Sequence, residues 1–234
     1  MMRLDKFLCE TGSGSRTVVK QLIKKGLVTV NGVVEKSPDK KIDEDTDIVF
    51  LDNEQLSYSR FHYYILHKPA GIITATQDKN EKTIMHLLED IPTRNLFPVG
   101  RLDKDTEGLL LITDDGDLAH KLLSPKMHVD KTYLVELESP ITEKEIESLK
   151  TGVDIGDKTI TMPAKVKKIE DNKIEITIQE GRYHQVKRMM RAVNNNVLYL
   201  KRISMGSLLL PPDLEKGYFR PLLESEVQLL KQEK

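Results

Sequence analysis

The segment from residue 97 to residue 116, FPVGRLDKDTEGLLLITDDG, constrains the fold of this chain more than any other. Charged side chains alternate with other residues between two apolar flanks; they are Arg101, Asp103, Asp105 and Glu107. Such charges do not belong in a core unless they are paired or functional. Gly100 and Gly108 permit tight backbone turns at the two ends of the charged stretch. The segment therefore predicts a loop that presents charged groups at a site, followed by a buried strand over residues 109–113.

Three kinds of site could use this loop. In a calcium-binding loop the last ligand should be a bidentate Glu, but Asp114 stands at that position, and a strand after Gly108 disagrees with a loop flanked by helices. A phosphotransfer site would need an apolar strand leading into Asp103, and residues 99–102 provide only a poor one. The third kind of site is a nucleophilic aspartate in an enzyme that acts on RNA.

Length and composition bound the class of protein. The 234 residues suit one large domain, or a small domain joined to a medium one. With 38% hydrophobic and 31% charged residues, the balance is that of a globular protein. The single cysteine, Cys9, excludes an internal disulfide framework and suits a reducing compartment. No apolar run reaches the roughly 20 residues that cross a bilayer, and the N-terminus lacks a secretory signal. We therefore expect a cytoplasmic protein without a membrane partner.

The charge is unevenly distributed, although the net charge is only −1. Lys and Arg outnumber acids in residues 1–41, acids dominate residues 42–60, and residues 181–202 contain Lys and Arg but no acid. Two basic islands in a neutral chain are candidate surfaces for a polyanion such as nucleic acid. Either island alone is equally compatible with an ordinary solvated face.

Residues 1–58, including a linker, are expected to form a small first domain that begins with two helices. Apolar residues recur at helical spacing over residues 4–8 and again over residues 16–25. Ser15 can cap the second helix and Gly26 can stop it. The first domain therefore starts as a helix pair whose second member is basic.

A hairpin is expected after the helices. Asn31-Gly32 separates the apolar runs 27–30 and 33–34, and both residues tolerate the positive φ angles of a type I′ turn. A further strand is expected over residues 47–51. The polar residues 52–59 are the expected linker to a second domain.

This first module resembles an S4 domain, a small RNA-binding fold. The resemblance covers about residues 2–51 and rests on RLDKFL at 3–8, SR at 15–16, LI at 22–23, Gly26 and VTVNG at 28–32. It implies that cations of the second helix lie along a phosphate backbone, which gives affinity more than sequence readout. The residues that we expect at the RNA are Arg3, Ser15, Arg16, Lys20, Lys24, Lys25 and Asn31.

Residues 59–234 are expected to form a second, larger domain of the α+β class. Short β-like runs alternate with turns and a few helices, which predicts a mixed, largely antiparallel sheet. The expected strands cover residues 63–66, 72–76, 109–113, 132–138, 164–169, 173–178, 197–202 and 208–210. The expected helices cover residues 83–88, 118–123, 143–150, 183–193 and 225–231.

The loop around Asp103 resembles the catalytic motif of pseudouridine synthases. GRLDKDTEGLL at 100–110 carries this resemblance, and its wording is similar to the RsuA family within that class. The other motifs of the family follow in the same order: HKPAGIITAT at 67–76, KTY at 131–133, EGRYHQVKRMM at 180–190 and LKRISMG at 200–206. Together with the S4 domain, the resemblance covers almost the whole chain.

The resemblance implies an isomerase that breaks the N1–C1′ bond of a uridine, turns the uracil and rejoins it through C5. The reaction needs a carboxylate held ionised beside the sugar or base, a part that the family gives to Asp103. Direct attack on C1′ and elimination to a glycal are both compatible with this assignment. A carboxylate in a closed pocket needs a nearby cation to stay ionised, and Lys187 aligns with the family's basic partner. No cofactor or metal is expected, because the sequence has neither metal-ligand spacing nor a phosphate-binding glycine motif.

The same resemblance assigns the remaining site residues. Tyr133 is expected to stack on the target base, and its hydroxyl can accept a proton. Arg101 is expected to fill the space that the flipped base leaves, a task that suits a planar guanidinium. The residues grouped with it as handling the base are Arg188, the second candidate partner of the carboxylate, His184 and Gln185. His67 is also expected to shape the pocket.

The expected partner is ribosomal RNA. A small-subunit (16S) target is favoured over a large-subunit (23S) target by the motif wording, and the substrate is either naked RNA or a ribosome assembly intermediate. We expect a monomer. The alternative from another class is a non-catalytic rRNA-binding assembly factor on the same fold. Asp103 discriminates between the two, because a pure binder has no need of an ionised carboxylate facing phosphates.

Overall fold

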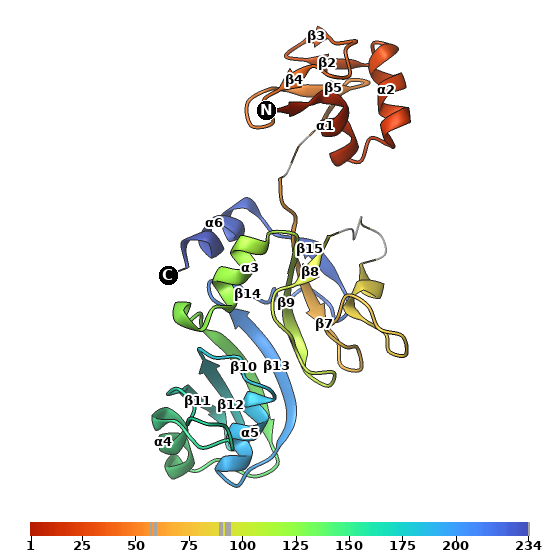
Figure 1. Cartoon of the computed structure of the whole chain (residues 1–234). Helices are drawn as coiled ribbons and strands as arrows, with labels where there is room; N and C mark the ends of the chain where they lie inside the picture. Colours follow the sequence, from red (N-terminus) through yellow and green to blue (C-terminus); the bar gives the residue numbers. More distant parts are fainter. Residues whose placement is uncertain (57, 59, 89–90, 92–94, 234) are drawn as a thin grey trace. The chain divides into compact units, whose positions relative to one another are not determined.

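The structure is a computed structural model that describes residues 1–56, 58, 60–88, 91 and 95–233. The chain divides into two compact units, Met1–Arg60 and Phe61–Lys234 (Figure 1). A short strand, β6 (Glu54–Leu56), occupies part of the stretch that the sequence predicts as a linker, and Ser57 and Ser59 lie outside the described residues. None of the helices in the described part of the chain is long and apolar enough to cross a membrane.

The first unit packs two helices against a small sheet. The helices are α1 (Leu4–Glu10) and α2 (Arg16–Lys24). The strands β2 (Val28–Val30), β3 (Val33–Val34), β5 (Val49–Leu51) and β6 form an antiparallel sheet in the order β3-β2-β5-β6, and β1 (Met2–Arg3) pairs with β4 (Lys41–Ile42). Apolar residues of both helices and of β2 and β5 share one buried core. The predicted two-helix and hairpin arrangement is confirmed.

The backbone at the turn and at the ends of the second helix agrees with the residue types found there. Asn31 and Gly32 have φ angles of 52° and 81°, as a type I′ turn requires. Gly26 ends the second helix with a φ of 78°. Ser15 stands at the cap of α2 with extended backbone, but its side chain makes no capping hydrogen bond within the described residues.

The second unit is built on one large sheet. Its main strands run in the order β11-β12-β10-β13-β9-β7-β15. Their bounds are β7 (Tyr63–Lys68), β9 (Glu107–Thr113), β10 (Lys131–Leu137), β11 (Lys165–Glu170), β12 (Lys173–Ile178), β13 (Val197–Met205) and β15 (Phe219–Pro221). Two short strands pair at the side, β8 (Phe97–Pro98) with β9 and β14 (Leu208–Leu209) with β13. Among the described strands, β9 and β13 are parallel and the other neighbours are antiparallel, which confirms the predicted mixed sheet.

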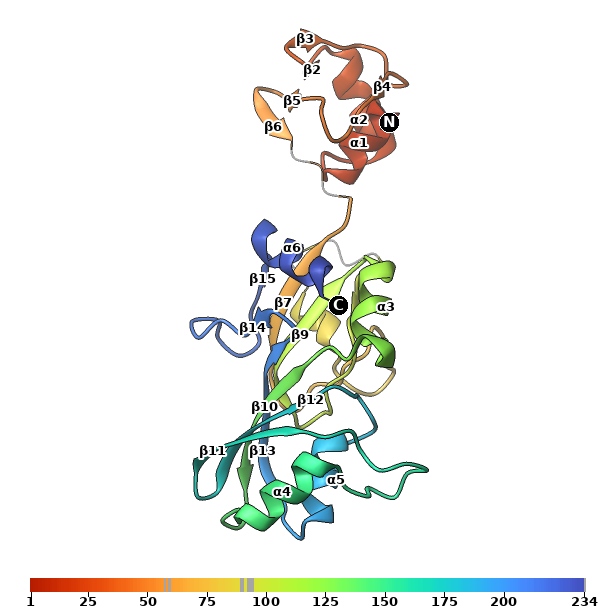
Figure 2. The same cartoon turned by 90° about the vertical axis from the view of Figure 1, so that its left-hand side faces the viewer.

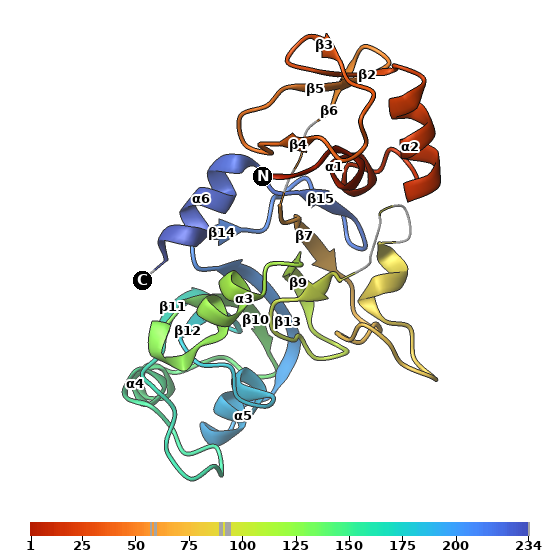
Figure 3. The same ribbon diagram turned by 45° about the horizontal axis from the view of Figure 1, so that its top comes forward.

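Helices cover both faces of this sheet. The helical segments are η1 (Ile84–Leu87), α3 (Gly116–Leu123), η2 (Pro125–Met127), α4 (Glu143–Thr151), α5 (Gln185–Ala192) and α6 (Glu224–Gln232). Leu109 and Leu111 of β9 share a core with α3 and α6, whereas Leu110 and Ile112 share another with α4 and α5. Figure 3 shows α4 beside β11 and β12, α5 beside β13, and α3 beside β9, and Figure 2 gives the same helices from another side. Because both faces are covered, all seven residues of β9 are buried.

One expectation about local structure is wrong, and two predicted helices differ in kind or in bounds. Residues 72–76 form only an isolated bridge, Ile73 with Thr83, in place of a strand. The predicted helix over 83–88 is a short 3-10 helix. The predicted helix over 183–193 begins only at Gln185, because His184 has a left-handed backbone with a φ of 48°. The short strands β8 and β15 were not predicted; each contains a proline, which lacks the N–H of a ladder and weakens a strand pattern.

Gly108 lies where three strands meet, opposite Lys68 of β7 and Arg202 of β13. Its φ is 107°, and an added Cβ would clash with the Arg202 carbonyl oxygen and lie 2.7 Å from the Arg202 nitrogen. We therefore expect Gly108→Ala to lower the free energy of unfolding by about 2 kcal/mol or more. Urea unfolding followed by circular dichroism measures the effect. The control is Gly116→Ala, where a Cβ would meet nothing within 4 Å; equal midpoints for the two variants would contradict this account of Gly108.

Candidate active site

Asp103 lies in the loop between β8 and β9, and a buried lysine forms hydrogen bonds to the backbone of this loop. Lys68, at the end of β7, is fully buried. Its Nζ donates to the carbonyl oxygens of Asp103, Lys104 and Thr106 at 3.1, 3.3 and 2.9 Å, and to that of Pro69 at 3.0 Å. Burial lowers the pKa of Lys68 to about 8. The ammonium thus ties the backbone of Asp103 and of the residues that follow it to the sheet.

The segment that was predicted as a strand over 72–76 holds the same loop by its side chains. The Thr74 hydroxyl donates to the Leu102 carbonyl at 2.8 Å, and it lies 3.2 Å from the Leu102 nitrogen. The Gly71 nitrogen donates to the Lys104 carbonyl at 2.8 Å. The backbone of the segment bonds locally: the Ile73 nitrogen donates to the Lys82 carbonyl at 3.1 Å, and the Ile73 carbonyl accepts from the Ala75 and Ile84 nitrogens, so these groups are not part of a strand ladder.

The Asp103 carboxylate faces two nitrogen groups of the third motif. Lys187 Nζ lies 3.3 Å from one carboxylate oxygen, and His184 Nε2 lies 3.5 Å from the other. The Asp103 side chain is 26% exposed and that of Lys187 is 17% exposed, so this pair is only partly screened by solvent. The predicted pairing of Asp103 with Lys187 therefore agrees with the geometry.

A second carboxylate shares the same lysine. Lys187 Nζ lies 2.5 Å from Asp105 Oδ1, closer than it lies to Asp103. The hydrogen bond from Lys187 lowers the pKa of Asp105 below its ordinary value. The Asp105 side chain is 73% exposed and points outward, whereas that of Asp103 is more enclosed. Lys187 thus joins an inner and an outer carboxylate of one loop.

A pocket opens beside Asp103, with about 420 Å³ of empty space that includes its mouth. Five predicted site residues line it: Arg101, Asp103, Tyr133, His184 and Gln185. Apolar side chains complete the wall, among them Ile178, Val186 and Leu200. A lining that combines polar and apolar side chains suits a flat, partly polar ligand such as a nucleobase.

Three separate parts of the chain supply the five predicted site residues of this lining. Tyr133 comes from β10 and is 8% exposed, so most of its ring is buried in the pocket wall. Arg101 comes from the loop before β9 and is exposed. His184 and Gln185 stand at the start of α5. The fold thus brings residues from distant parts of the sequence to one pocket.

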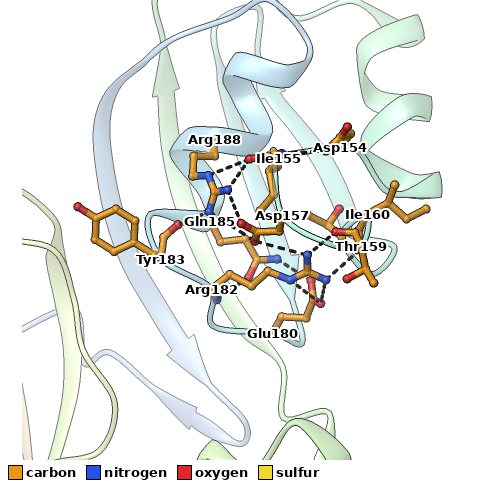
Figure 4. Close-up of polar contacts among 12 residues, drawn as sticks. Asp154, Ile155, Asp157, Thr159, Ile160, Glu180, Arg182, Tyr183, Gln185 and Arg188 are labelled. Carbon is orange, nitrogen blue, oxygen red and sulfur yellow. Dashed lines mark hydrogen bonds and ion pairs between the residues drawn. The ribbon is translucent and has the colours of Figure 1, made fainter.

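Arg188 does not join the pocket. Its Nε donates to the Ile155 carbonyl at 3.0 Å, its Nη2 lies 2.6 Å from an Asp157 oxygen, and its Nη1 donates to the Tyr183 carbonyl at 3.1 Å (Figure 4). Successive residues of a helix point about 100° apart, so Lys187 faces the Asp103 loop while Arg188 faces residues 154–160. The expectation that Arg188 handles the base or pairs with Asp103 has no support in this geometry.

Gln185 lines the pocket, but its side-chain amide forms hydrogen bonds with nearby residues of the same motif. Its oxygen accepts from the Arg182 nitrogen at 3.0 Å, and its nitrogen donates to Glu180 at 2.9 Å. Arg182, which was not singled out as a site residue, reaches the carbonyls of Thr159 and Ile160 at 2.6 and 2.9 Å. Figure 4 shows these bonds as one network. Gln185 therefore stiffens the pocket wall.

His67 lies apart from the pocket. It is 5% exposed, and its Nδ1 is 2.7 Å from the carbonyl oxygen of Leu214. Burial lowers the pKa of His67. It fixes the segment that leads from β14 to β15, and the expectation that it shapes the pocket is wrong because its ring packs against that segment.

The predicted RNA-binding residues of the first unit are mostly exposed. Those on or beside α2 are exposed: Ser15, Arg16, Lys20, Lys24 and Lys25. Arg3 pairs with Asp5 at 2.8 Å. The Asn31 side chain donates to Asp47 at 2.8 Å and accepts from the Ile48 nitrogen at 2.9 Å, so it links the turn of the hairpin to the segment before β5.

Sequence reasoning missed the roles of two neighbours of Asp103, which are Lys68 and Asp105. A lysine inside an otherwise apolar strand, directly before Pro69, was the available signal for Lys68. Within the described residues no group of three or more His, Cys, Asp or Glu side chains could hold a metal ion.

Known proteins resemble this chain over both units. Residues 62–192 match the RNA pseudouridylate synthase family, and residues 2–48 match the S4 domain. The chain is 48% identical to the uncharacterized RNA pseudouridine synthase YtzG of Bacillus subtilis, with 98% of each chain covered. It is 39% identical to the ribosomal small subunit pseudouridine synthase A of Escherichia coli, with 97% of this chain and 98% of that protein covered. A crystal structure of a pseudouridylate synthase matches with a TM-score of 0.70 and 38% identity, over 98% of this chain and 100% of that one.

Proposed function

The chain belongs to the RNA pseudouridylate synthase family, and we propose that it converts one uridine of small-subunit (16S) ribosomal RNA to pseudouridine. The name of the relative from Escherichia coli supports the small subunit as the source of the substrate. The observation that carries the chemical part is the Asp103 carboxylate, 3.3 Å from Lys187 and 3.5 Å from His184 at the wall of an open pocket.

The proposed reaction is an isomerisation in which atoms and electrons balance within one nucleotide. The N1–C1′ bond breaks, a C5–C1′ bond forms, the proton on C5 leaves and N1 takes up a proton. Asp103 supplies the carboxylate, either by attack on C1′ or by removing the neighbouring sugar proton, and it is regenerated in both cases. Lys187 Nζ pairs with one oxygen of this carboxylate and the His184 ring lies against the other, so both side chains hold Asp103 in position at the pocket.

The pocket wall provides the proposed binding site for the uridine. Leaving the RNA helix costs a few kcal/mol, and stacking on the buried ring of Tyr133 offsets part of that cost. The exposed Arg101 occupies the place in the helix that the uridine leaves. The Lys68 hydrogen bonds fix the Asp103 loop before the substrate arrives, so little ordering is needed at the moment of reaction.

The S4 domain supplies sequence-independent affinity in this proposal. Exposed cations of α2 can neutralise phosphates along one strand of RNA, which makes binding weaken as salt rises. We propose that the protein works as a monomer in the cytoplasm, on 16S rRNA that is either free or part of an assembly intermediate.

The test is to map pseudouridines in ribosomal RNA from cells with and without the gene. We expect one pseudouridine of 16S rRNA to disappear and to return when the wild-type gene is restored. A site lost from 23S rRNA would contradict the small-subunit assignment and favour the large-subunit alternative. Unchanged pseudouridine in both RNAs would contradict the enzymatic assignment and favour an assembly factor.

A further inference from the structure

An aromatic ring stands in solvent beside the pocket. Tyr183 is 75% exposed, and its ring stacks on that of His184 with centroids 3.8 Å apart and planes 20° apart. His184 Nε2 in turn lies 3.5 Å from Asp103 Oδ1. The Tyr183 ring is therefore separated from the proposed reacting carboxylate by a single aromatic layer.

The backbone that carries this ring is held firmly. The Tyr183 carbonyl accepts a hydrogen bond from Arg188, which is itself bound to Ile155 and Asp157. On the other side, Arg182 is bound to Glu180 and to two carbonyls of residues 159–160. Figure 4 shows the Tyr183 ring pointing away from this network. A ring fixed in this way loses little conformational freedom when a ligand covers it.

The surroundings of the ring favour RNA as the ligand. A single exposed aromatic side chain is ordinary on a protein surface, but this one belongs to the acid-free basic stretch 181–202. Arg101 and Arg182 line the same pocket as His184. Exposed aromatic faces next to cations bind unpaired nucleotides, because the rings stack on bases while the cations meet phosphates.

We propose that the outer face of Tyr183 binds the base of a nucleotide next to the target uridine. The ligand is an unpaired nucleobase that leaves the RNA helix together with the uridine and stacks on the Tyr183–His184 pair. The hydroxyl of Tyr183 is not needed for this contact, since stacking uses the ring face. This inference rests on the proposed function, because it requires the target uridine to enter the pocket beside Asp103.

The test compares Tyr183→Leu, which removes the ring, with Tyr183→Phe, which keeps it. The matched control is Tyr218→Leu, because Tyr218 is 63% exposed but does not line the pocket. The substrate is an rRNA fragment that the wild-type enzyme is seen to convert, with 2-aminopurine replacing one neighbour of the target uridine at a time. Steady-state kinetics and the fluorescence of 2-aminopurine, which stacking quenches, are measured for each variant.

We expect Tyr183→Leu to raise KM about tenfold and to lose the quenching at one neighbouring position. Tyr183→Phe and Tyr218→Leu should match the wild type in both measurements. Wild-type KM and quenching in Tyr183→Leu would overturn this inference and leave the proposed function standing. Failure of the wild-type enzyme to convert any rRNA fragment would overturn the proposed function and this inference with it.

Discussion

The Asp103→Asn variant is expected to form no pseudouridine above background, a loss of at least about 10³-fold in rate. The amide has nearly the shape of the carboxylate, but it carries no negative charge and its oxygen is a poor nucleophile. The contact with Lys187 would weaken for the same reason. RNA binding should stay near that of the wild type, because removing one negative charge does not weaken attraction to phosphates.

The control for this variant is Asp105→Asn, which makes the same change two residues along the loop. Asp105 lies 2.5 Å from Lys187 but its side chain is 73% exposed, so we expect its variant to keep activity within about tenfold of the wild type. Single-turnover conversion and RNA affinity, both at one fixed salt concentration, are the measurements. An inactive Asp105→Asn beside an active Asp103→Asn would move the chemistry to the outer carboxylate.

The Lys187→Met variant is expected to lose about 10² to 10³-fold in kcat. Its ammonium is the nearer of the two nitrogen groups that face Asp103, and methionine keeps much of the side-chain length without the charge. Asp103 would then keep only His184 of the two facing nitrogen groups, and a partly buried carboxylate would lose its ion-pair partner. Lys187→Arg should recover part of the rate because it restores the positive charge.

A matched loss of charge on the same helix separates chemistry from phosphate affinity. Arg191 is exposed in the last turn of α5, and Arg191→Met should change KM without lowering kcat more than about twofold. Steady-state kinetics on one rRNA fragment compares the three variants. Equal losses of kcat in Lys187→Met and Arg191→Met would contradict a specific role for the ion pair with Asp103.

Much of the pocket was predictable because its residues belong to continuous motifs. The motif at 100–110 carries Arg101 and Asp103, and the motif at 180–190 carries His184 and Gln185. The strand with Tyr133 alternates buried and half-buried residues along its whole length, a period that the sequence displays. The family resemblance joined these motifs into one site before any distance was known.

The facing direction of individual side chains was harder to predict. Lys187 and Arg188 are neighbours in sequence, and which of them faces Asp103 depends on where α5 begins, which the left-handed backbone at His184 sets. His67 stands directly before Lys68 in a strand, so the two side chains point to opposite faces of the sheet. Only Lys68 reaches the Asp103 loop. Such differences depend on helix phase and strand register, which residue types alone do not reveal.

The segments that were misjudged use tertiary bonds in place of local ones. Residues 72–76 read as a strand by composition, yet Thr74 bonds to Leu102 across the loop that carries Asp103. β8 and β15 are two and three residues long, and tertiary pairing with β9 and β7 orders them. Short elements of this kind carry too little pattern to be seen without their partners.

The most direct test of the proposed site is a crystal structure of Asp103→Asn bound to an rRNA fragment that the wild-type enzyme converts. We predict that the target uridine is out of its helix, with its base against Tyr133, its sugar facing residue 103, and Arg101 in the place it left. A uridine that stays stacked in its helix, or that binds away from residue 103, would contradict the account.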